Sequence, residues 1–93
     1  MQFDWDEENR THLARHNVLP EEAEQTFIND PVDLEVQEDD DDGYRYRQIG
    51  ETTSGRILVF LSTVRGESVR IITGWDAPKA YKDFYLMQKA KSS

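Results

Sequence analysis

Cysteine is absent from this sequence, so the chain can form neither a disulfide framework nor a thiolate metal site. This composition is typical of a protein in a reducing compartment. No apolar run approaches the roughly 20 residues that a membrane-spanning helix requires. The first eight residues also lack the basic start and the apolar core of a signal peptide. We therefore expect a cytoplasmic protein with no membrane partner.

An excess of positive charge is missing as well. The chain carries a net charge of −8, which argues against a nucleic-acid partner because phosphate binding draws most of its affinity from Lys and Arg. The distribution weakens that argument. Residues 1–43 hold fifteen carboxylates and two arginines, a net charge of −13, whereas residues 44–93 hold nine basic and four acidic residues, a net charge of +5. Such asymmetry indicates either a basic contact surface or attraction between two halves of one fold.

Internal repeats and low-complexity linkers are also absent. Ninety-three residues are too few for two hydrophobic cores, because each half would bury too little surface to offset the loss of chain entropy. Residues 1–93 are therefore expected to form a single domain.

The predicted sheet is centred on Ile57–Leu61, an unbroken apolar run that is typical of a central strand buried on both faces. Strand-like segments at residues 44–49 and 69–73 lie on either side of it in the sequence. The connections contain Gly55 and Gly66 and have the lengths of hairpin turns. These features predict an antiparallel meander.

Three helices are predicted around this meander. Asp6 is a suitable N-cap for a helix from about Asp6 to His16, and Asn17 can adopt a left-handed conformation at its end. A second helix begins near Pro20 and ends before Pro31, because the residue before proline avoids the helical region. A third follows Asp76, with an apolar stripe of Ala77, Ala80, Tyr81, Phe84 and Met87.

Two further strands complete the prediction. Phe3–Trp5 is a short candidate, and residues 32–36 alternate apolar with acidic side chains, which predicts a strand with one buried face. The predicted fold class is therefore α+β: an antiparallel sheet of about four to five strands with two N-terminal helices and one C-terminal helix.

Two patterns suggest a metal, and neither is sufficient. His12 and His16 are four residues apart and could ligate one ion, but no zincin glutamate or third ligand accompanies them. Structural or phosphate-facing roles are favoured for both histidines. Asp39–Asp42 lack the ligand spacing of an EF-hand loop, so this run is predicted to form an exposed hairpin tip. We predict neither a metal nor a cofactor.

An ordered series of short motifs resembles a known family. Phe3-x-Trp5-Asp6 leads into a helix that ends His12-Leu13-Ala14-Arg15-His16-Asn17-Val18, followed by Pro20-Glu21-Glu22-Ala23, Phe27 and Asp30-Pro31. Later come Arg45 before Ile49-Gly50, then Thr63-Val64-Arg65 and Arg70-Ile71-Ile72-Thr73. This series resembles BrnT-type toxins over nearly the whole chain.

The resemblance implies a RelE-like fold and the toxin half of a type II toxin–antitoxin pair, with a ribbon-helix-helix antitoxin as its partner. Members of the family act as metal-independent ribonucleases that arrest translation. Such an enzyme promotes attack of an RNA 2′-hydroxyl on the adjacent phosphate, and arginines suit the stabilisation of the crowded phosphorane because a guanidinium fork matches phosphate oxygens.

The resemblance also supplies candidate site residues. The catalytic candidates are His16, Arg45, Arg65 and Arg70. The RNA-binding candidates are Arg15, which also matches a basic position of the family, and Arg47, Trp75 and Lys79, which do not rest on the resemblance; Trp75 could stack on a base. His16 is preferred to His12 for acid–base work, for which the imidazole charge change near neutral pH is suited. Solvent-facing strand decoration for the arginines, and a core position for Trp75, are the alternative interpretations.

The chain also departs from the family pattern. A glutamate expected near the hairpin glycine is replaced by Gly43 or Tyr44, an arginine expected after the strand of Arg70 is replaced by Trp75, and the terminal helix is less basic. The alternative function is therefore a catalytically weak or inactive toxin relative that acts as a protein-binding module. A homodimer through the terminal helix is compatible with either function.

Overall fold

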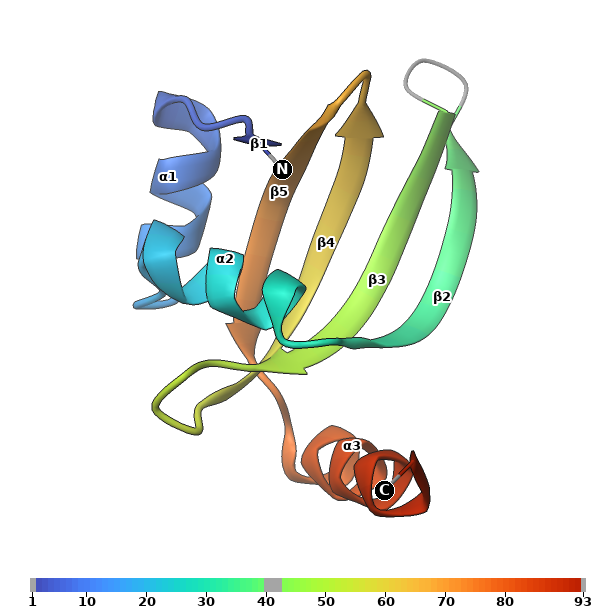
Figure 1. The fold of residues 1–93 in the computed structure, drawn as a ribbon. Coiled ribbons are helices and arrows are strands. Elements are labelled where there is room, and N and C mark those ends of the chain that lie inside the picture. The colour runs from blue at the N-terminus through green and yellow to red at the C-terminus, as the bar shows by residue number, and fades with distance from the viewer. Residues whose placement is uncertain (1, 40–42, 93) are drawn as a thin grey trace.

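The computed structural model describes residues 2–39 and 43–92, which form a sheet, two helices beside it and a third helix at one end (Figure 1). The elements are β1 (Gln2–Phe3), α1 (Glu7–Ala14), α2 (Pro20–Ile28), β2 (Val32–Asp39), β3 (Gly43–Glu51), β4 (Ile57–Arg65), β5 (Ser68–Asp76) and α3 (Lys79–Ser92). The predicted α+β class is confirmed, with three helices and five strands among the described residues. The predicted turn at Asp39–Asp42 falls largely on residues 40–42, which lie outside the described part.

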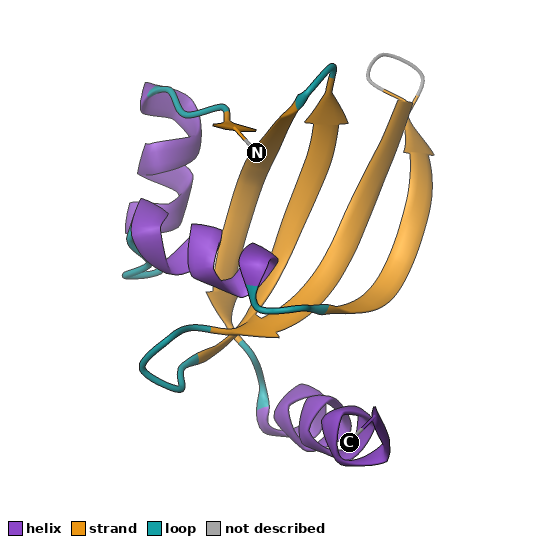
Figure 2. Cartoon of the chain, in the orientation of Figure 1, coloured by secondary structure: helices purple, strands orange, loops and turns teal. Residues whose placement is uncertain are grey.

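The sheet has the strand order β1-β5-β4-β3-β2. The strands β3 to β5 form the predicted antiparallel meander, and β2 extends it by pairing antiparallel with β3 (Figure 2). Each of the four strands is longer than its sequence pattern indicated. The short strand β1 pairs in parallel with β5, so the sheet is mixed rather than purely antiparallel.

Helix α1 is fixed at its N-terminus by a reciprocal cap. The Asp6 carboxylate accepts the Asn9 backbone N–H at 3.1 Å, and the Asn9 side chain accepts the Asp6 N–H at 2.8 Å. The helix ends at Ala14, two residues earlier than predicted. Asn17 has a φ of 56°, which confirms the predicted left-handed conformation and turns the chain toward α2.

Helix α2 begins with Pro20 in its first turn, as predicted, and crosses the same face of the sheet as α1. It approaches β3 so closely that a Cβ added at Gly50 would lie 2.7 Å from the Thr26 carbonyl oxygen. A glycine is therefore required at this contact between helix and sheet.

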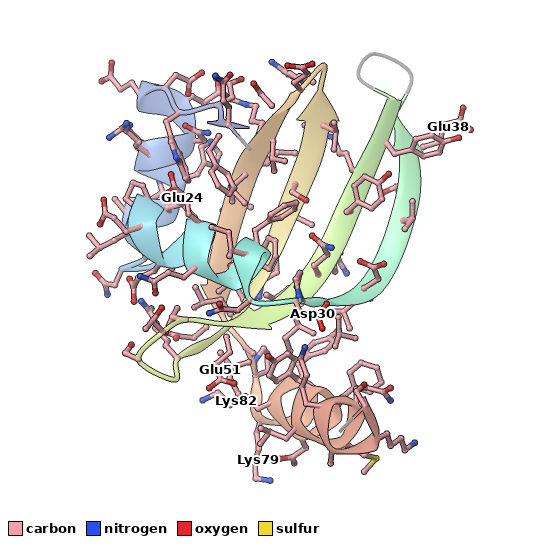
Figure 3. The ribbon with its side chains drawn as sticks, in the orientation of Figure 1. Glu24, Asp30, Glu38, Glu51, Lys79 and Lys82 are labelled. Carbon is pink, nitrogen blue, oxygen red and sulfur yellow. The ribbon has the colours of Figure 1, made fainter. Side chains whose placement is uncertain are left out.

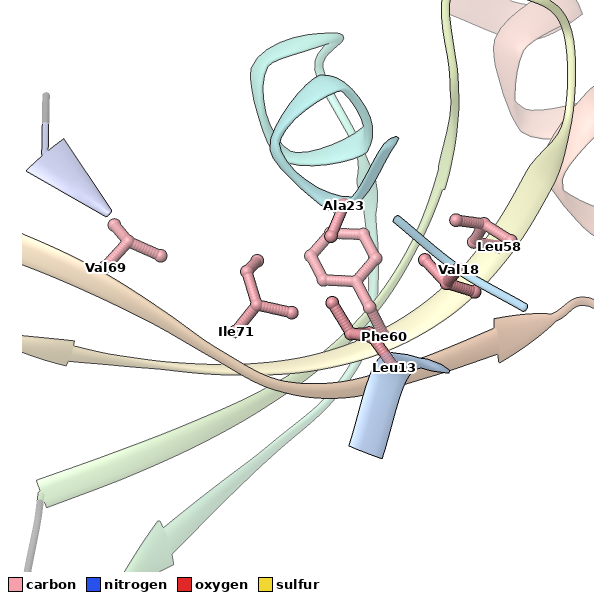
Figure 4. Packing of buried hydrophobic residues seen from close by; sticks show 7 residues of the cluster. All are labelled: Leu13, Val18, Ala23, Leu58, Phe60, Val69 and Ile71. Carbon is pink, nitrogen blue, oxygen red and sulfur yellow. The ribbon is translucent and has the colours of Figure 1, made fainter. Parts of the chain in front are cut away.

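The central strand β4 is buried on both faces, as its apolar run indicated. Leu58 and Phe60 pack with α1 and α2 in a first core, whose other buried members are Leu13, Val18, Ala23, Val69 and Ile71 (Figure 4). Ile57 and Val59 point the other way, into a second core with Ile49, Ala77 and Tyr85. Full burial of a side chain the size of Phe60 contributes about 1.5–3 kcal/mol.

Two sequence predictions about packing are wrong. A register shift between Asp33 and Glu35 turns β2 over, so Val36 lies on the opposite face from Val32 and is 52% exposed. In α3, the predicted stripe faces solvent for most of its length. Tyr85 is the buried residue of that helix instead, because α3 lies beyond the lower end of the sheet and does not cover its face (Figure 1). None of the described helices is both long and apolar enough to cross a membrane.

Candidate active site

Three of the predicted arginines gather on the sheet face opposite α1 and α2. Arg45, Thr63 and Arg70 are paired across β3, β4 and β5, so their side chains point to one face. Arg65 lies two residues beyond Thr63 and shares that face. Val59 occupies the same face further along β4 and belongs to the second core. The arginine row and α3 therefore lie on one face, at opposite ends.

These arginines line a cavity of about 250 Å³, which we call the arginine cavity. Its lining residues are Asp6, Glu8, Arg45, Thr63, Arg65, Arg70 and Ile72. Three guanidinium groups thus face two carboxylates, and the lining is net positive in a chain whose net charge is −8. The carboxylates come from the start of α1, which reaches this face past the edge of β5.

Arg70 is held by an ion-pair network rather than presented to solvent. Its Nη1 and Nη2 lie 3.0 and 3.1 Å from the two Asp6 carboxylate oxygens, and Nη1 lies 3.5 Å from Asp4. The Arg70 side chain is 9% exposed. Its hydrogen bond holds the pKa of Asp6 below the ordinary value, and the same bond raises the pKa of Arg70. Both groups are therefore charged at neutral pH.

The Asn9 side chain also holds the first turn of α1 on the sheet. Its side-chain amide is buried and donates to the Asp4 carbonyl at 2.9 Å and to the Ile71 carbonyl at 3.1 Å. These bonds join the first turn of α1 to β5. The sequence gave no indication of the strand that Asn9 would bind.

Glu8 is the cavity residue that sequence reasoning missed as a site residue. It is the second residue of α1, and it lines both the arginine cavity and a neighbouring open cavity of about 400 Å³. The neighbouring cavity is also lined by Glu7, Thr11, His12 and Arg15. In the sequence, Glu8 reads only as a favourable acid for the helix dipole.

Arg47 extends the basic row along β3. It lies two residues from Arg45 on the same face, and it lines a smaller depression of about 90 Å³ with Glu35, Gln37, Arg45 and Leu61. Its Nη1 is 3.6 Å from the Glu35 carboxylate, and both side chains are largely exposed. This ion pair is weak for that reason.

His16 lies away from the arginines, although it was named with them as a catalytic candidate. Its ring packs at 6.1 Å from the Trp75 ring. Trp75 pairs with Val59, whereas Arg70 pairs with Thr63, four residues further along β4 and thus roughly 13 Å away. Trp75 packs against the second core, which agrees with its alternative interpretation.

Arg15 and Lys79 also do not line the arginine cavity. Arg15 lies at the C-terminal end of α1 and lines the neighbouring cavity. Lys79 begins α3 and pairs with Asp83 at 2.9 Å. Figure 3 shows Lys79 at the lower end of the molecule and Glu38, whose partner Tyr44 precedes Arg45, at the other end.

Arg56 was not predicted as a site or structural residue, yet its guanidinium forms an extensive polar network. Its guanidinium donates to Asp76 at 2.8 and 3.1 Å, to Glu22 at 3.0 Å, and to the backbone carbonyls of Asn17 and His16 at 2.7 and 3.3 Å. It therefore links the β3–β4 hairpin to the α1–α2 turn and to the end of β5. This role is structural.

Among the described residues, no group of three or more His, Asp and Glu side chains could hold a metal ion. In comparisons with known proteins, residues 5–81 match the family model described as the ribonuclease toxin, BrnT, of type II toxin–antitoxin systems. This match covers most of the chain. No curated protein matches it.

Proposed function

Because this chain belongs to the BrnT family of ribonuclease toxins from type II toxin–antitoxin systems, we propose that it is an endoribonuclease whose active surface is the arginine cavity. Family membership implies an antitoxin partner. The proposed activity is cleavage of cellular RNA in the cytoplasm, with arrest of translation as its consequence and a ribbon-helix-helix protein as the antitoxin.

The proposed reaction uses the RNA's own nucleophile. A 2′-hydroxyl attacks the adjacent phosphorus, the 5′-oxygen leaves, and a 2′,3′-cyclic phosphate remains. The phosphorane between these states carries more negative charge than the ground-state phosphate. Fixed cationic donors stabilise that state more than the substrate, and such groups typically contribute a factor of about 10²–10³ each to the rate. This route needs no metal-bound water.

The convergence of Arg45, Arg65 and Arg70 is the single observation that carries the proposal. They come from three strands of a continuous hydrogen-bonded sheet, which holds their backbones in fixed relative positions. Their guanidinium groups face a cavity whose lining is net positive, although the chain as a whole is acidic. If these arginines were only solvent-exposed strand residues without a shared function, they would not need to gather at one cavity.

The geometry supports different roles for the three arginines. Arg70 is already bound to Asp6 and Asp4, so we assign it the positioning of the first turn of α1. Arg45 and Arg65 are the proposed phosphate ligands, and Arg47 extends the RNA contact along β3. His16, Arg15, Trp75 and Lys79 are not part of the proposed active surface.

Cleavage of a labelled RNA by the purified full-length chain, in the presence of EDTA, tests the proposal. We expect the wild-type chain to leave 2′,3′-cyclic phosphate ends, and we expect Arg45→Ala and Arg65→Ala each to lower the rate by about 10²–10³. Lys82→Ala is the matched control, because it removes one positive charge from α3 at the other end of the molecule (Figure 3).

Two results would refute the proposal. One is a wild-type chain that folds and binds RNA or antitoxin but leaves RNA intact, which would favour a binding module. The other is cleavage that survives both arginine substitutions at the rate of Lys82→Ala, which would indicate another site or a contaminating nuclease.

A further inference from the structure

We infer that Glu8 is the general base of this reaction, the group that accepts the proton of the attacking 2′-hydroxyl. The inference rests on the proposed function and deepens it. The observation behind it is that a carboxylate from α1 lines the cavity in which Arg45 and Arg65 would hold the phosphate. A base must lie within hydrogen-bond reach of the hydroxyl it deprotonates, and that hydroxyl is adjacent to the bound phosphate.

Asp6, the other carboxylate in the cavity, is unsuited to the task. Both of its oxygens are engaged by the Arg70 guanidinium, at 3.0 and 3.1 Å, and one also accepts the Asn9 N–H that caps α1. Protonation would weaken the ion pair and the helix cap together. Asp6 is therefore committed to structure, and its lowered pKa makes it a poorer proton acceptor.

The remaining candidates are excluded by contact or by position. The Thr63 hydroxyl is buried and donates to the Tyr44 carbonyl at 2.8 Å. The His16 ring packs on Trp75, near the other end of the sheet. His12 lines the neighbouring cavity and not the arginine cavity. Among the residues that line the arginine cavity, Glu8 is thus the side chain left for proton transfer.

The side chain of Glu8 is exposed, and its charge acts on Arg70, to which Asp6 is hydrogen-bonded. Its backbone is nevertheless fixed, because the capping box and the Asn9 bonds to Asp4 and Ile71 hold the first turn of α1 on β5. A rigid backbone that carries an exposed carboxylate is the arrangement that a general base requires. It also gives Arg70 and Asn9 a function as positioning residues.

The proposed step is balanced in protons and bonds. Glu8 accepts the 2′-hydroxyl proton as the 2′-oxygen forms a bond to phosphorus and the bond from phosphorus to the 5′-oxygen breaks. The departing 5′-oxygen takes a proton from water, and Glu8 returns its own proton to solvent. The net reaction is an internal transesterification that needs no oxidant, reductant or further reactant.

Glu8→Gln and Glu7→Gln form a matched pair for the test. Both replace an acid in the first turn of α1 by its neutral isostere, so both lose the same interaction with the helix dipole. Glu7 does not line the arginine cavity. Single-turnover cleavage of a labelled RNA measures the rate, and binding of the same sequence with 2′-O-methyl groups measures affinity without cleavage. Circular dichroism checks the fold.

We expect Glu8→Gln to cleave about 10²–10⁴ times more slowly than wild type and to bind the methylated RNA as tightly or more tightly, because a negative charge near the phosphate is removed. Glu7→Gln should cleave within about threefold of wild type, in keeping with the small energies of first-turn charges.

Failure of the inference is distinct from failure of the proposed function. A wild-type chain that does not cleave RNA refutes both. If the wild-type chain cleaves, the inference alone is overturned by a Glu8→Gln variant within about threefold of Glu7→Gln, a margin inside first-turn charge effects. It is also overturned if Glu8→Gln loses RNA binding along with cleavage, because Glu8 would then hold the site together. A His12→Ala variant that loses activity while Glu8→Gln keeps it would transfer the role to His12.

Discussion

Replacement of Arg56 by alanine should destabilise the fold far more than the loss of an ordinary surface ion pair. The Arg56 and Glu22 side chains are 24% and 21% exposed, so their charge-assisted hydrogen bond is worth about 1.5–3 kcal/mol. The Asp76 side chain is 62% exposed, which limits that pair to about 0.2–1 kcal/mol. Donation to the His16 and Asn17 carbonyls, just beyond the C-terminal end of α1, contributes about 0.3–1 kcal/mol. We therefore expect Arg56→Ala to lower the free energy of unfolding by about 2–5 kcal/mol.

Urea denaturation at pH 7 measures this difference, and Lys79→Ala is its control. The Lys79–Asp83 pair has nearly the same length, 2.9 Å, but its side chains are 87% and 60% exposed. Its loss should lower stability by no more than about 0.5 kcal/mol. Arg56→Lys should recover only part of the deficit, because an ammonium group cannot donate to two carboxylates and two carbonyls in one plane.

The pH dependence of the stability difference between wild type and Arg56→Ala provides an independent check of this prediction. The hydrogen bond from Arg56 holds the pKa of Asp76 below its usual value of 3.8. The stabilisation is therefore fully present above that pH and is lost as the pH falls through the lower folded-state pKa. The gap between wild type and Arg56→Ala should narrow from pH 6 to pH 3. A deficit below about 1 kcal/mol at pH 7, within the range of exposed pairs, or one that does not narrow in acid, would refute this reasoning.

Three further predictions concern the support of the candidate site. Asp6→Asn keeps a competent N-cap but loses the ion pair with Arg70. Because the pKa of Asp6 is lowered, wild type should be more stable than the variant above pH 4, and the difference in stability should vanish in acid. Equal urea midpoints at pH 7 would contradict this prediction. Asn9→Ala should lower the free energy of unfolding by about 1–3 kcal/mol, since the Asp4 and Ile71 carbonyls lose their donor. A loss below about 0.5 kcal/mol, which is the range of ordinary surface substitutions, would indicate that water replaces the amide. Gly50→Ala should destabilise the folded protein by about 1–3 kcal/mol in thermal unfolding, because the added Cβ would lie 2.7 Å from the Thr26 carbonyl oxygen. An unchanged melting temperature would show that α2 can move away from β3.

Local features of the fold could be predicted because each depends on a few neighbouring residues. The Asp6 cap, the left-handed Asn17 and the first-turn Pro20 are set by side-chain chemistry within one helical turn. The meander followed from an apolar run between two turns. These features require no knowledge of distant contacts.

The errors have a common origin in register and tertiary contact. The bulge in β2 adds one residue to the strand, and nothing in the alternation of residues 32–36 signals it. The buried face of α3 depends on where the chain leaves β5. Of the predicted stripe, Ala77 reaches the second core just before the helix begins, and within α3 the core contact is made by Tyr85 instead.

The candidate site was half predictable. Arg45, Arg65 and Arg70 were identified from the family resemblance, and their convergence follows from pairing across the meander. The arrival of Asp6 and Glu8 at the same cavity depends on the two-residue pairing of β1 with β5 and on a contact between residues 64 positions apart. The spacing of these residues in the sequence does not indicate such a contact. His16 was favoured for its chemistry, and only the fold separates it from the arginines.

The central claim is that RNA binds in the arginine cavity, and an NMR titration tests it most directly. With 2′-O-methyl RNA as the ligand, we predict shifts of the Arg45 and Arg65 side-chain Nε–H resonances and of the amides in the first turn of α1, while the Arg56 resonance stays in place. Shifts confined to α3 or to the His16–Trp75 contact would contradict the account.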